Sequence, residues 1–312
     1  MSPGDTARLL LLAGLWGGSF AFMRVAVPAL GPLWLAFSRV AIAFMALFVL
    51  SLARRSVPPL FAHWRGYLVI GTVNSALPFA LFCFAEQYIS ASAAAILNAT
   101  SPFFGALVAA LWLGETLTLR KIAGMALGLA GVVVLVGWQP EPLSGTMLWA
   151  TLACLGAALC YGVASVYAKQ RMAAVPSSAV ALYSQLAAAV VLAPALCFVP
   201  APPGPLTPLV AANVLALALA STAFAYLLYF RLIATIGPAR ALTVTFLIPL
   251  FGVLWGFLFL DEPFAANTLS GCALIVAGTW IAARIAPPRA IGSPAVRAAT
   301  LAKMPENWDL GW

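Results

Sequence analysis

The sequence predicts an all-α integral membrane protein, with ten transmembrane helices arranged as two inverted-topology repeats of five helices. Two observations predict this class. Of the 312 residues, 64% are hydrophobic and only 8% are charged, whereas an ordinary globular protein carries about 25% charged residues. The apolar segment from Pro102 to Glu115 also recurs from Pro249 to Glu262, 147 positions later, which indicates two related halves.

Ten apolar stretches, separated by proline, glycine and charged residues, define the expected spans. A bilayer core is crossed by about 20 helical residues, and residues 172–230 contain no charged residue and have room for two such spans. Because lipid offers no hydrogen-bond partners, each stretch must satisfy its own backbone as a helix. The predicted limits are 7–27, 33–53, 65–85, 89–113, 118–137, 145–168, 177–199, 208–231, 236–260 and 266–286.

The lysine and arginine residues orient these spans. With a cytoplasmic N-terminus, the outward loops carry only Arg24. Cytoplasmic loops are typically rich in basic residues, so we expect both termini to be cytoplasmic. The net charge of +8 follows from this distribution and does not indicate a nucleic-acid partner. The inward loops and the tail hold Arg54, Arg55, Arg65, Arg120, Lys121, Lys169, Arg171, Arg231, Arg240, Arg284, Arg289, Arg297 and Lys303.

The repeat continues beyond the segment that first reveals it. At an offset of 147, Asn98 falls on Thr245, and at an offset of 145, Trp16 falls on Tyr161. Each half therefore holds five spans, and because five is odd, the second half enters the membrane from the opposite side. We expect a first repeat at 1–140, a second at 141–286 and a disordered cytoplasmic tail at 287–312.

These halves resemble the EamA family of the drug/metabolite transporter superfamily, over about residues 7–286. The resemblance implies a basket of ten helices in a bacterial inner membrane. It further implies export or exchange of amino acids and other small metabolites, by alternating access through a central cavity. The motifs that carry it are Trp16-Gly17-Gly18-Ser19-Phe20 with Arg24, Phe37-Ser38-Arg39, Ala93-Ala94-Ala95 with Pro102, Leu113-Gly114-Glu115, and Pro249 with Leu260-Asp261-Glu262.

Polar and aromatic side chains inside the spans are the candidate substrate contacts. Polar groups are costly in hydrocarbon and usually face a cavity or another helix. A proline inside a helix frees a carbonyl about four residues earlier, so Asn98 and Thr245 mark a polar spot in each half or only satisfy those carbonyls. The aromatic candidates either line the cavity as a cage or pack between helices. The candidates are Trp16, Ser19, Asn74, Phe79, Asn98, Ser101, Tyr161, Ser165, Ser221, Tyr226 and Thr245.

Five residues are expected to serve the fold: Arg39, Pro102, Glu115, Pro249 and Glu262. Arg39 lies inside the second span and can snorkel or pair with a polar helix end, with a substrate carboxylate as the alternative partner. Glu115 and Glu262 end equivalent spans, where each carboxylate can accept N–H groups from the first turn of the next helix. Capping is therefore expected for both, rather than ion coupling.

The residue inventory argues against an enzyme and against a metal or cofactor. The only histidine, His63, lies in a loop, and the five cysteines lie in apolar segments without a CxxC pattern. No Asp or Glu lies in the middle of a span, which disfavours a proton-coupled multidrug antiporter, the alternative transport mechanism. The sequence favours an exporter or facilitator of small neutral or zwitterionic solutes, monomeric or weakly dimeric, over a non-transporting receptor or scaffold.

Overall fold

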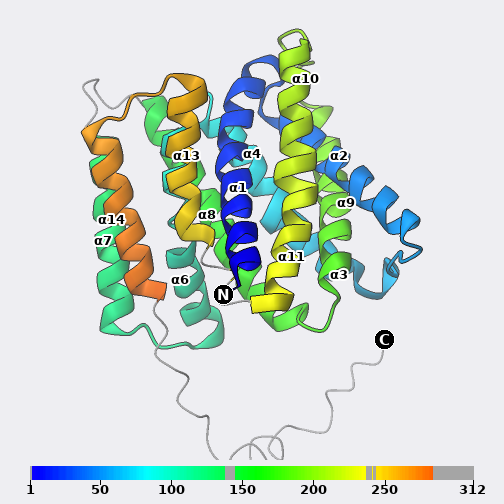
Figure 1. Cartoon of the computed structure of the whole chain (residues 1–312), viewed down its shortest axis with the longest axis horizontal. Helices are drawn as coiled ribbons and strands as arrows, with labels where there is room; N and C mark the ends of the chain where they lie inside the picture. The colour runs from blue at the N-terminus through cyan, green and yellow to red at the C-terminus, as the bar shows by residue number, and fades with distance from the viewer. Residues whose placement is uncertain (1, 138–144, 237–240, 242–243, 284–312) are drawn as a thin grey trace, which may run out of the picture. The chain divides into compact units, whose positions relative to one another are not determined.

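The computed structural model describes residues 2–137, 145–236, 241 and 244–283. Within these ranges every regular element is helical (Figure 1). The predicted tail at 287–312 and Arg240 lie outside the described residues. Seven helical runs are long and apolar enough to cross a membrane: Pro3–Leu30, Pro32–Ala53, Phe61–Ala85, Ala91–Leu113, Gly145–Arg171, Ser177–Leu196 and Pro208–Tyr229. Two shorter helices, Val244–Leu260 and Ala266–Ile281, are also apolar.

One helical run in the first half of the chain contains a π-helical segment. This π-helix, η2 (Thr72–Ala76), follows α3 directly and is followed directly by α4, so the run stays helical throughout. The elements are α1 (Pro3–Leu30), α2 (Pro32–Ala53), the short 3-10 helix η1 (Phe61–His63), α3 (Trp64–Gly71), η2, α4 (Leu77–Ala85), α5 (Ala91–Asn98), α6 (Ser101–Leu113) and α7 (Leu119–Gly137).

The second half repeats this irregularity at the equivalent place. A second π-helix, η3 (Ala216–Phe224), joins α10 to α11. Shifting η2 by 147 positions gives residues 219–223, which lie inside η3. Because π-turns inside helices often mark functional sites, both segments are of interest below. The other elements are α8 (Gly145–Arg171), α9 (Ser177–Leu196), α10 (Pro208–Leu215), α11 (Ala225–Ile236), α13 (Val244–Leu260) and α14 (Ala266–Ala283).

Several helices begin at hydroxyl side chains that cap them. The Ser2 hydroxyl accepts the N–H of Asp5 at the start of α1, and the Ser90 hydroxyl accepts the N–H of Ala93 at the start of α5. These bonds satisfy N–H groups that have no acceptor within the helix. At the other end of α1, Gly31 has a φ of +75°, a conformation that favours glycine and separates α1 from α2.

The fourth predicted span, 89–113, is divided into two helices. Helix α5 ends at Asn98, and α6 begins at Ser101 with Pro102 in its first turn. Proline lacks an N–H group and suits the first turn of a helix, where that group has no acceptor in any case. The expectation that Pro102 lies inside a continuous helix is therefore wrong, whereas Pro249 does lie inside α13.

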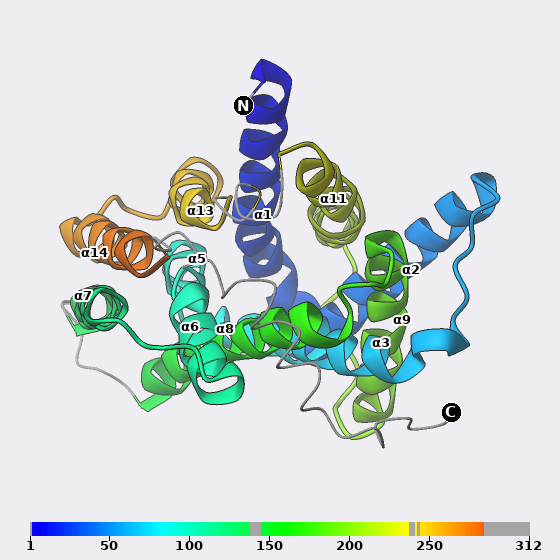
Figure 2. The same ribbon diagram turned by 90° about the horizontal axis from the view of Figure 1, so that it is seen from below.

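Close helix packing depends on glycines at the helix crossings. A Cβ atom at Gly17 of α1 would stand 2.9 Å from the backbone nitrogen of Gly252 in α13. A Cβ atom at Gly162 of α8 would stand 2.8 Å from the nitrogen of Gly105 in α6. Helices α7 and α14, which Figure 2 shows side by side, also meet through glycines. Small residues at crossings are typical of membrane helices, whose association depends on close packing.

The turn after α13 contains a residue in the left-handed region. Asp261 has a φ of +53°, and Gly114, the equivalent residue after α6, has a φ of +67°. The next N–H group, that of Glu262, donates to the Gly256 carbonyl at 3.2 Å and closes the turn. Both turns therefore need the same backbone conformation, but only the first has glycine, which adopts it without steric cost.

Replacing Asp261 by glycine should raise the free energy of unfolding by about 0.5 kcal/mol. Relief of the left-handed strain gives about 1 kcal/mol, and the greater freedom of glycine in the unfolded chain removes part of this gain. Thermal unfolding of the purified protein in one detergent measures the change. The matched substitution Gly114→Asp should shift the midpoint downward, and an upward shift for Gly114→Asp would contradict the explanation.

Candidate functional site

Arg39 of α2 is buried between helices from both halves of the chain, with 5% of its surface exposed. Its Nε donates to the hydroxyl oxygen of Thr222 in η3 at 2.9 Å, and its Nη1 lies 3.7 Å from the sulfur of Met23. Its Cζ lies 3.6 Å from the ring centroid of Phe79 in α4, a cation–π arrangement. Among the described residues, no acidic side chain forms an ion pair with this guanidinium.

Gln185 of α9 is buried and belongs to a second set of polar contacts, which Tyr226 links to Arg39. Its Nε2 donates to the hydroxyl of Ser75 in η2 at 3.1 Å, and the carboxamide of Asn74 donates to the Tyr226 hydroxyl at 3.0 Å. Tyr226 interacts with Ser75, Gln185 and Arg39 as well. We refer to these residues together as the polar cluster: Arg39, Asn74, Ser75, Gln185, Thr222 and Tyr226.

The polar cluster brings together two of the predicted substrate contacts, Asn74 and Tyr226, and places a third, Phe79, under Arg39. Ser75, Thr222 and Gln185 are not among the candidate contacts selected from the sequence, and Gln185 is the one that sequence reasoning did not consider. A pattern was present, because Tyr183-Ser184-Gln185 repeats Phe37-Ser38-Arg39 146 positions later. The π-helices supply Asn74, Ser75 and Thr222, so the irregular segments of both halves meet in this cluster.

Two other candidates, Trp16 and Ser19, lie on α1, and a third, Ser221 of η3, binds α1. The Ser221 hydroxyl donates to the Leu15 carbonyl at 2.7 Å, and the Ser19 hydroxyl donates to the Trp16 carbonyl at 2.6 Å. The Trp16 ring lies 5.4 Å from the ring of Tyr229. Both hydroxyl groups thus bind helix backbone, which satisfies their donors without a solute.

The two candidates on α8, Tyr161 and Ser165, have different surroundings. The Tyr161 ring stacks on Phe82 at a centroid distance of 6.3 Å. Ser165 is exposed, and its hydroxyl donates to the Gly162 carbonyl at 2.8 Å. Tyr161 also interacts with Arg39 and Tyr226, so the cage of aromatic side chains stays a prediction.

Asn98 and Ser101 flank the break between α5 and α6. The Ser101 hydroxyl donates to the Asn98 carbonyl at 2.6 Å and lies 3.3 Å from the Asn98 side-chain oxygen. The Asn98 carbonyl, four residues before Pro102, is therefore satisfied by the Ser101 hydroxyl, and the role predicted for the Asn98 side chain stays a prediction. Thr245, the equivalent of Asn98, is half-buried near the start of α13.

Glu262 binds the first turn of a helix that is distant in sequence. Its Oε1 accepts the N–H of Ala91 at 2.7 Å, and its Oε2 accepts the N–H of Ser92 at 3.0 Å together with the Ser92 hydroxyl. These groups open α5, so the expectation that Glu262 caps the next helix along the chain is wrong. Packing of α13 against α5 brings the unpaired N–H groups of α5 to this carboxylate.

Glu115, the repeat equivalent of Glu262, has different partners. Its carboxylate forms ion pairs with Lys169 at 3.3 Å and with Lys121 at 3.6 Å, and its side chain is 39% exposed. In the part of the chain that the structure describes, Glu115 thus acts as a partner of lysines rather than as the predicted helix cap.

Glu86 is a buried acid that follows the last residue of α4. Both of its carboxylate oxygens lack hydrogen-bond partners among the described residues, and the Arg24 guanidinium donates to its backbone carbonyl. Burial raises the pKa of the Glu86 carboxyl well above its usual value, and Arg24 opposes the shift. Sequence reasoning placed Glu86 at the end of a span but did not foresee its burial.

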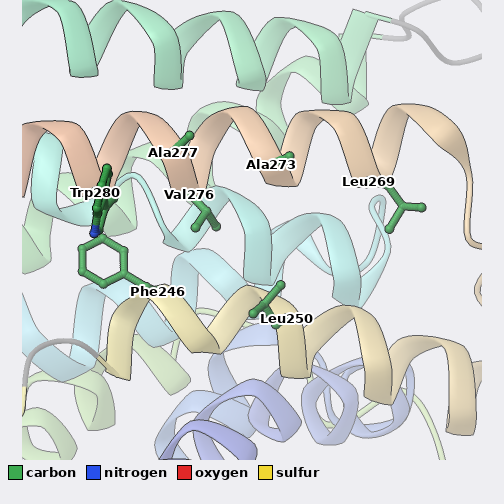
Figure 3. A pocket seen from close by; sticks show the side chains of 7 residues that line it. All are labelled: Phe246, Leu250, Leu269, Ala273, Val276, Ala277 and Trp280. Carbon is green, nitrogen blue, oxygen red and sulfur yellow. The ribbon is translucent and has the colours of Figure 1, made fainter.

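The cavity between α13 and α14 is apolar and has a volume of about 410 Å³. Figure 3 shows Trp280 of α14 and Phe246 of α13 close together at one end of it. None of the predicted substrate contacts lines this cavity, and its chemistry suits an apolar group rather than a polar solute. Its lining consists of Phe246, Leu250, Leu269, Ala273, Val276, Ala277 and Trp280. Within the described ranges no group of three or more His, Cys, Asp or Glu side chains is placed to hold a metal ion.

Comparison with known proteins gives a family match over most of the chain. The sequence profile of the EamA-like transporter family matches residues 7–137 and again residues 148–284. A solved crystal structure has a TM-score of 0.63 at 23% identity, over 90% of this chain and 97% of the other. That similarity shows a common fold.

Three curated relatives align over most of their own length. "Uncharacterized transporter YoaV" of Bacillus subtilis (strain 168) is 23% identical, over 86% of this chain and 92% of the relative. "Probable terminal-alkyne amino-acid exporter" of Streptantibioticus cattleyicolor is 27% identical, over 88% and 91%. "Probable amino-acid metabolite efflux pump" of Salmonella typhimurium is 28% identical, over 90% and 95%.

Proposed function

The chain belongs to the EamA-like transporter family, and on this basis we propose that it exports or equilibrates small metabolites such as amino acids. It is a multi-pass membrane protein, and the proposal places it in a bacterial inner membrane with both termini in the cytoplasm. The amino-acid substrates are supported by the names of two relatives, an amino-acid exporter and an amino-acid metabolite efflux pump.

The proposed mechanism is alternating access between two inverted repeats of five spans. One observation carries it: Gly17 of α1 packs on Gly252 of α13, and Gly162 of α8 packs on Gly105 of α6. Gly162 follows Gly17 by 145 positions, and Gly252 follows Gly105 by 147, so the two crossings are repeat equivalents of each other. Reciprocal contacts of this kind are expected when a pseudo-two-fold axis relates the halves.

The polar cluster is the proposed place of solute binding. It joins α2 and η2 of the first half to α9 and η3 of the second half. In inverted-repeat transporters the solute site lies near the bilayer midplane between the repeats, and one repeat rocks against the other around it. A polar site that both halves build therefore suits the mechanism better than the apolar cavity between α13 and α14.

Counterflow in proteoliposomes tests the transport function directly. We expect vesicles that contain the purified protein and are preloaded with unlabelled amino acids to accumulate the matching labelled amino acid transiently. Protein-free vesicles from the same lipid are the control. A receptor or scaffold predicts no counterflow, so its absence across a panel of amino acids, polyamines, nucleosides and cationic drugs would overturn the proposal.

Proton-coupled exchange is the alternative that one observation favours. Glu86 is a buried carboxyl without hydrogen-bond partners among the described residues, and its raised pKa makes it able to hold a proton. The same vesicles distinguish the mechanisms. If an imposed pH gradient drives uptake without a solute gradient, and Glu86→Gln removes this response, then proton coupling replaces facilitated transport.

A further inference from the structure

Arg39 and Gln185 hold equivalent places in the two halves of the chain. They end sequence triplets that lie 146 positions apart, and their hydrogen-bond partners, Thr222 and Ser75, lie 147 positions apart. The bond from Arg39 Nε to the Thr222 hydroxyl (2.9 Å) is therefore the repeat equivalent of the bond from Gln185 Nε2 to the Ser75 hydroxyl (3.1 Å). Each bond ties a helix of one half to the π-helix of the other half.

The aromatic neighbours follow the same relation. Phe79 lies under the Arg39 guanidinium, and Tyr226 interacts with Gln185. Phe79 and Tyr226 are 147 positions apart. Each half thus contributes to the cluster a side-chain donor, a hydroxyl acceptor on a π-helix and an aromatic ring.

The two equivalent sets of contacts differ in charge: Arg39 carries a positive charge, and its counterpart Gln185 is neutral. Gln185 makes the equivalent bond with a neutral amide, so a bond of this kind does not itself require a cation. A buried charge without a partner is costly, and no acid pairs with Arg39 among the described residues. The other groups that interact with it are Thr222, Met23, Phe79, Tyr161, Tyr226, Cys83 and, beyond ion-pair distance, Glu86.

We propose that Arg39 is the anion-binding residue of the solute site and that it binds a carboxylate of the transported molecule. The inference rests on the proposed transport function and narrows the substrates to solutes that carry a carboxylate. The guanidinium has five N–H donors and binds a carboxylate through two of them at once. Its Nε is already committed to Thr222, so its outer nitrogens are the expected donors to the solute.

Binding to amino acids and to their carboxamides tests the inference. Thermal unfolding in detergent is followed with the proteinogenic amino acids and, in parallel, with the corresponding amino-acid amides, which lack the carboxylate. We expect at least one amino acid to stabilise the wild-type protein while its amide does not. Arg39→Gln should weaken this binding about tenfold or more, and it should leave the unfolding midpoint without ligand near that of the wild type, because glutamine makes the equivalent bond in the other half.

Two further variants keep the test decisive. Arg39→Lys retains the charge and should bind the amino acid better than Arg39→Gln, which a purely structural role does not predict. Arg54→Gln removes an exposed arginine and should leave binding unchanged. Stabilisation by none of the amino acids, or equal affinities of Arg39→Gln and the wild type, would overturn the inference. Counterflow that persists in Arg39→Gln would overturn it while sparing the transport function, whereas carboxylate binding without counterflow in the wild type would contradict transport alone.

Discussion

Replacing Glu262 by alanine should lower the free energy of unfolding of the detergent-solubilised protein by about 2–4 kcal/mol. The Glu262 carboxylate accepts hydrogen bonds from the N–H groups of Ala91 and Ser92 and from the Ser92 hydroxyl. Hydrogen bonds to a charged acceptor stabilise more than neutral ones, and the substitution leaves two N–H groups at the start of α5 without a partner. Thermal or denaturant unfolding in one detergent gives the difference.

Glu115→Ala is the matched control, because Glu115 is the repeat equivalent of Glu262. Its partners are Lys121 and Lys169, and its side chain is 39% exposed. Partly exposed ion pairs contribute about 0–1 kcal/mol, so the loss should be below about 1 kcal/mol. If Glu262→Ala and Glu115→Ala lowered the free energy of unfolding equally, the hydrogen bonds from Glu262 to α5 would not explain its role in stability.

Replacing Gly17 by valine should cost about 3 kcal/mol or more and reduce the yield of folded protein strongly. A Cβ atom at this position would stand 2.7 Å from the Phe251 Cβ and 2.9 Å from the Gly252 nitrogen, so the backbones of α1 and α13 must separate. Since close packing of small residues is what holds membrane helices together, the separation weakens the whole crossing. Size-exclusion chromatography and thermal unfolding of the purified variant measure the effect.

Gly162→Val should have a similar effect, because its Cβ would stand 2.8 Å from the Gly105 nitrogen at the equivalent crossing of α8 and α6. Gly156→Ala in α8 is the control: its Cβ would meet only the Leu81 side chain, at 3.6 Å, an ordinary contact. Alanine is the better helix former by about 1 kcal/mol, so this change should be neutral or stabilising. A folded, fully stable Gly17→Val protein would refute the packing argument.

The all-helical membrane class and the approximate helix positions could be predicted because they follow from local chemistry. Long apolar stretches without charge must form helices in lipid, where each backbone group needs a partner within its own segment. The described helices lie within or near the predicted spans for the same reason. Local pattern did not foresee the break before Pro102, because a proline with an apolar neighbourhood is compatible both with the interior of a membrane helix and with its first turn.

The candidate site was predictable only in part. Asn74 and Tyr226 were expected because polar residues are rare in the spans, and the structure joins them at 3.0 Å. Gln185 was missed, although the triplet that ends in it repeats the triplet that ends in Arg39. The repetition becomes informative only when the partners are known: Gln185 donates to Ser75, and Arg39 donates to Thr222. Each partner lies more than a hundred residues away in the chain, so the sequence pattern alone does not show the pairing.

The sequence by itself determined the membrane class, the approximate helix limits and the presence of two related halves, because hydropathy and backbone hydrogen bonding act residue by residue along the chain. The tertiary structure alone decided which groups meet. The segments that end in Glu115 and Glu262 read alike, yet one carboxylate pairs with lysines and the other caps α5. The partner of a side chain is set by how helices pack, and in lipid this packing depends on shape complementarity between distant segments, which no local pattern records.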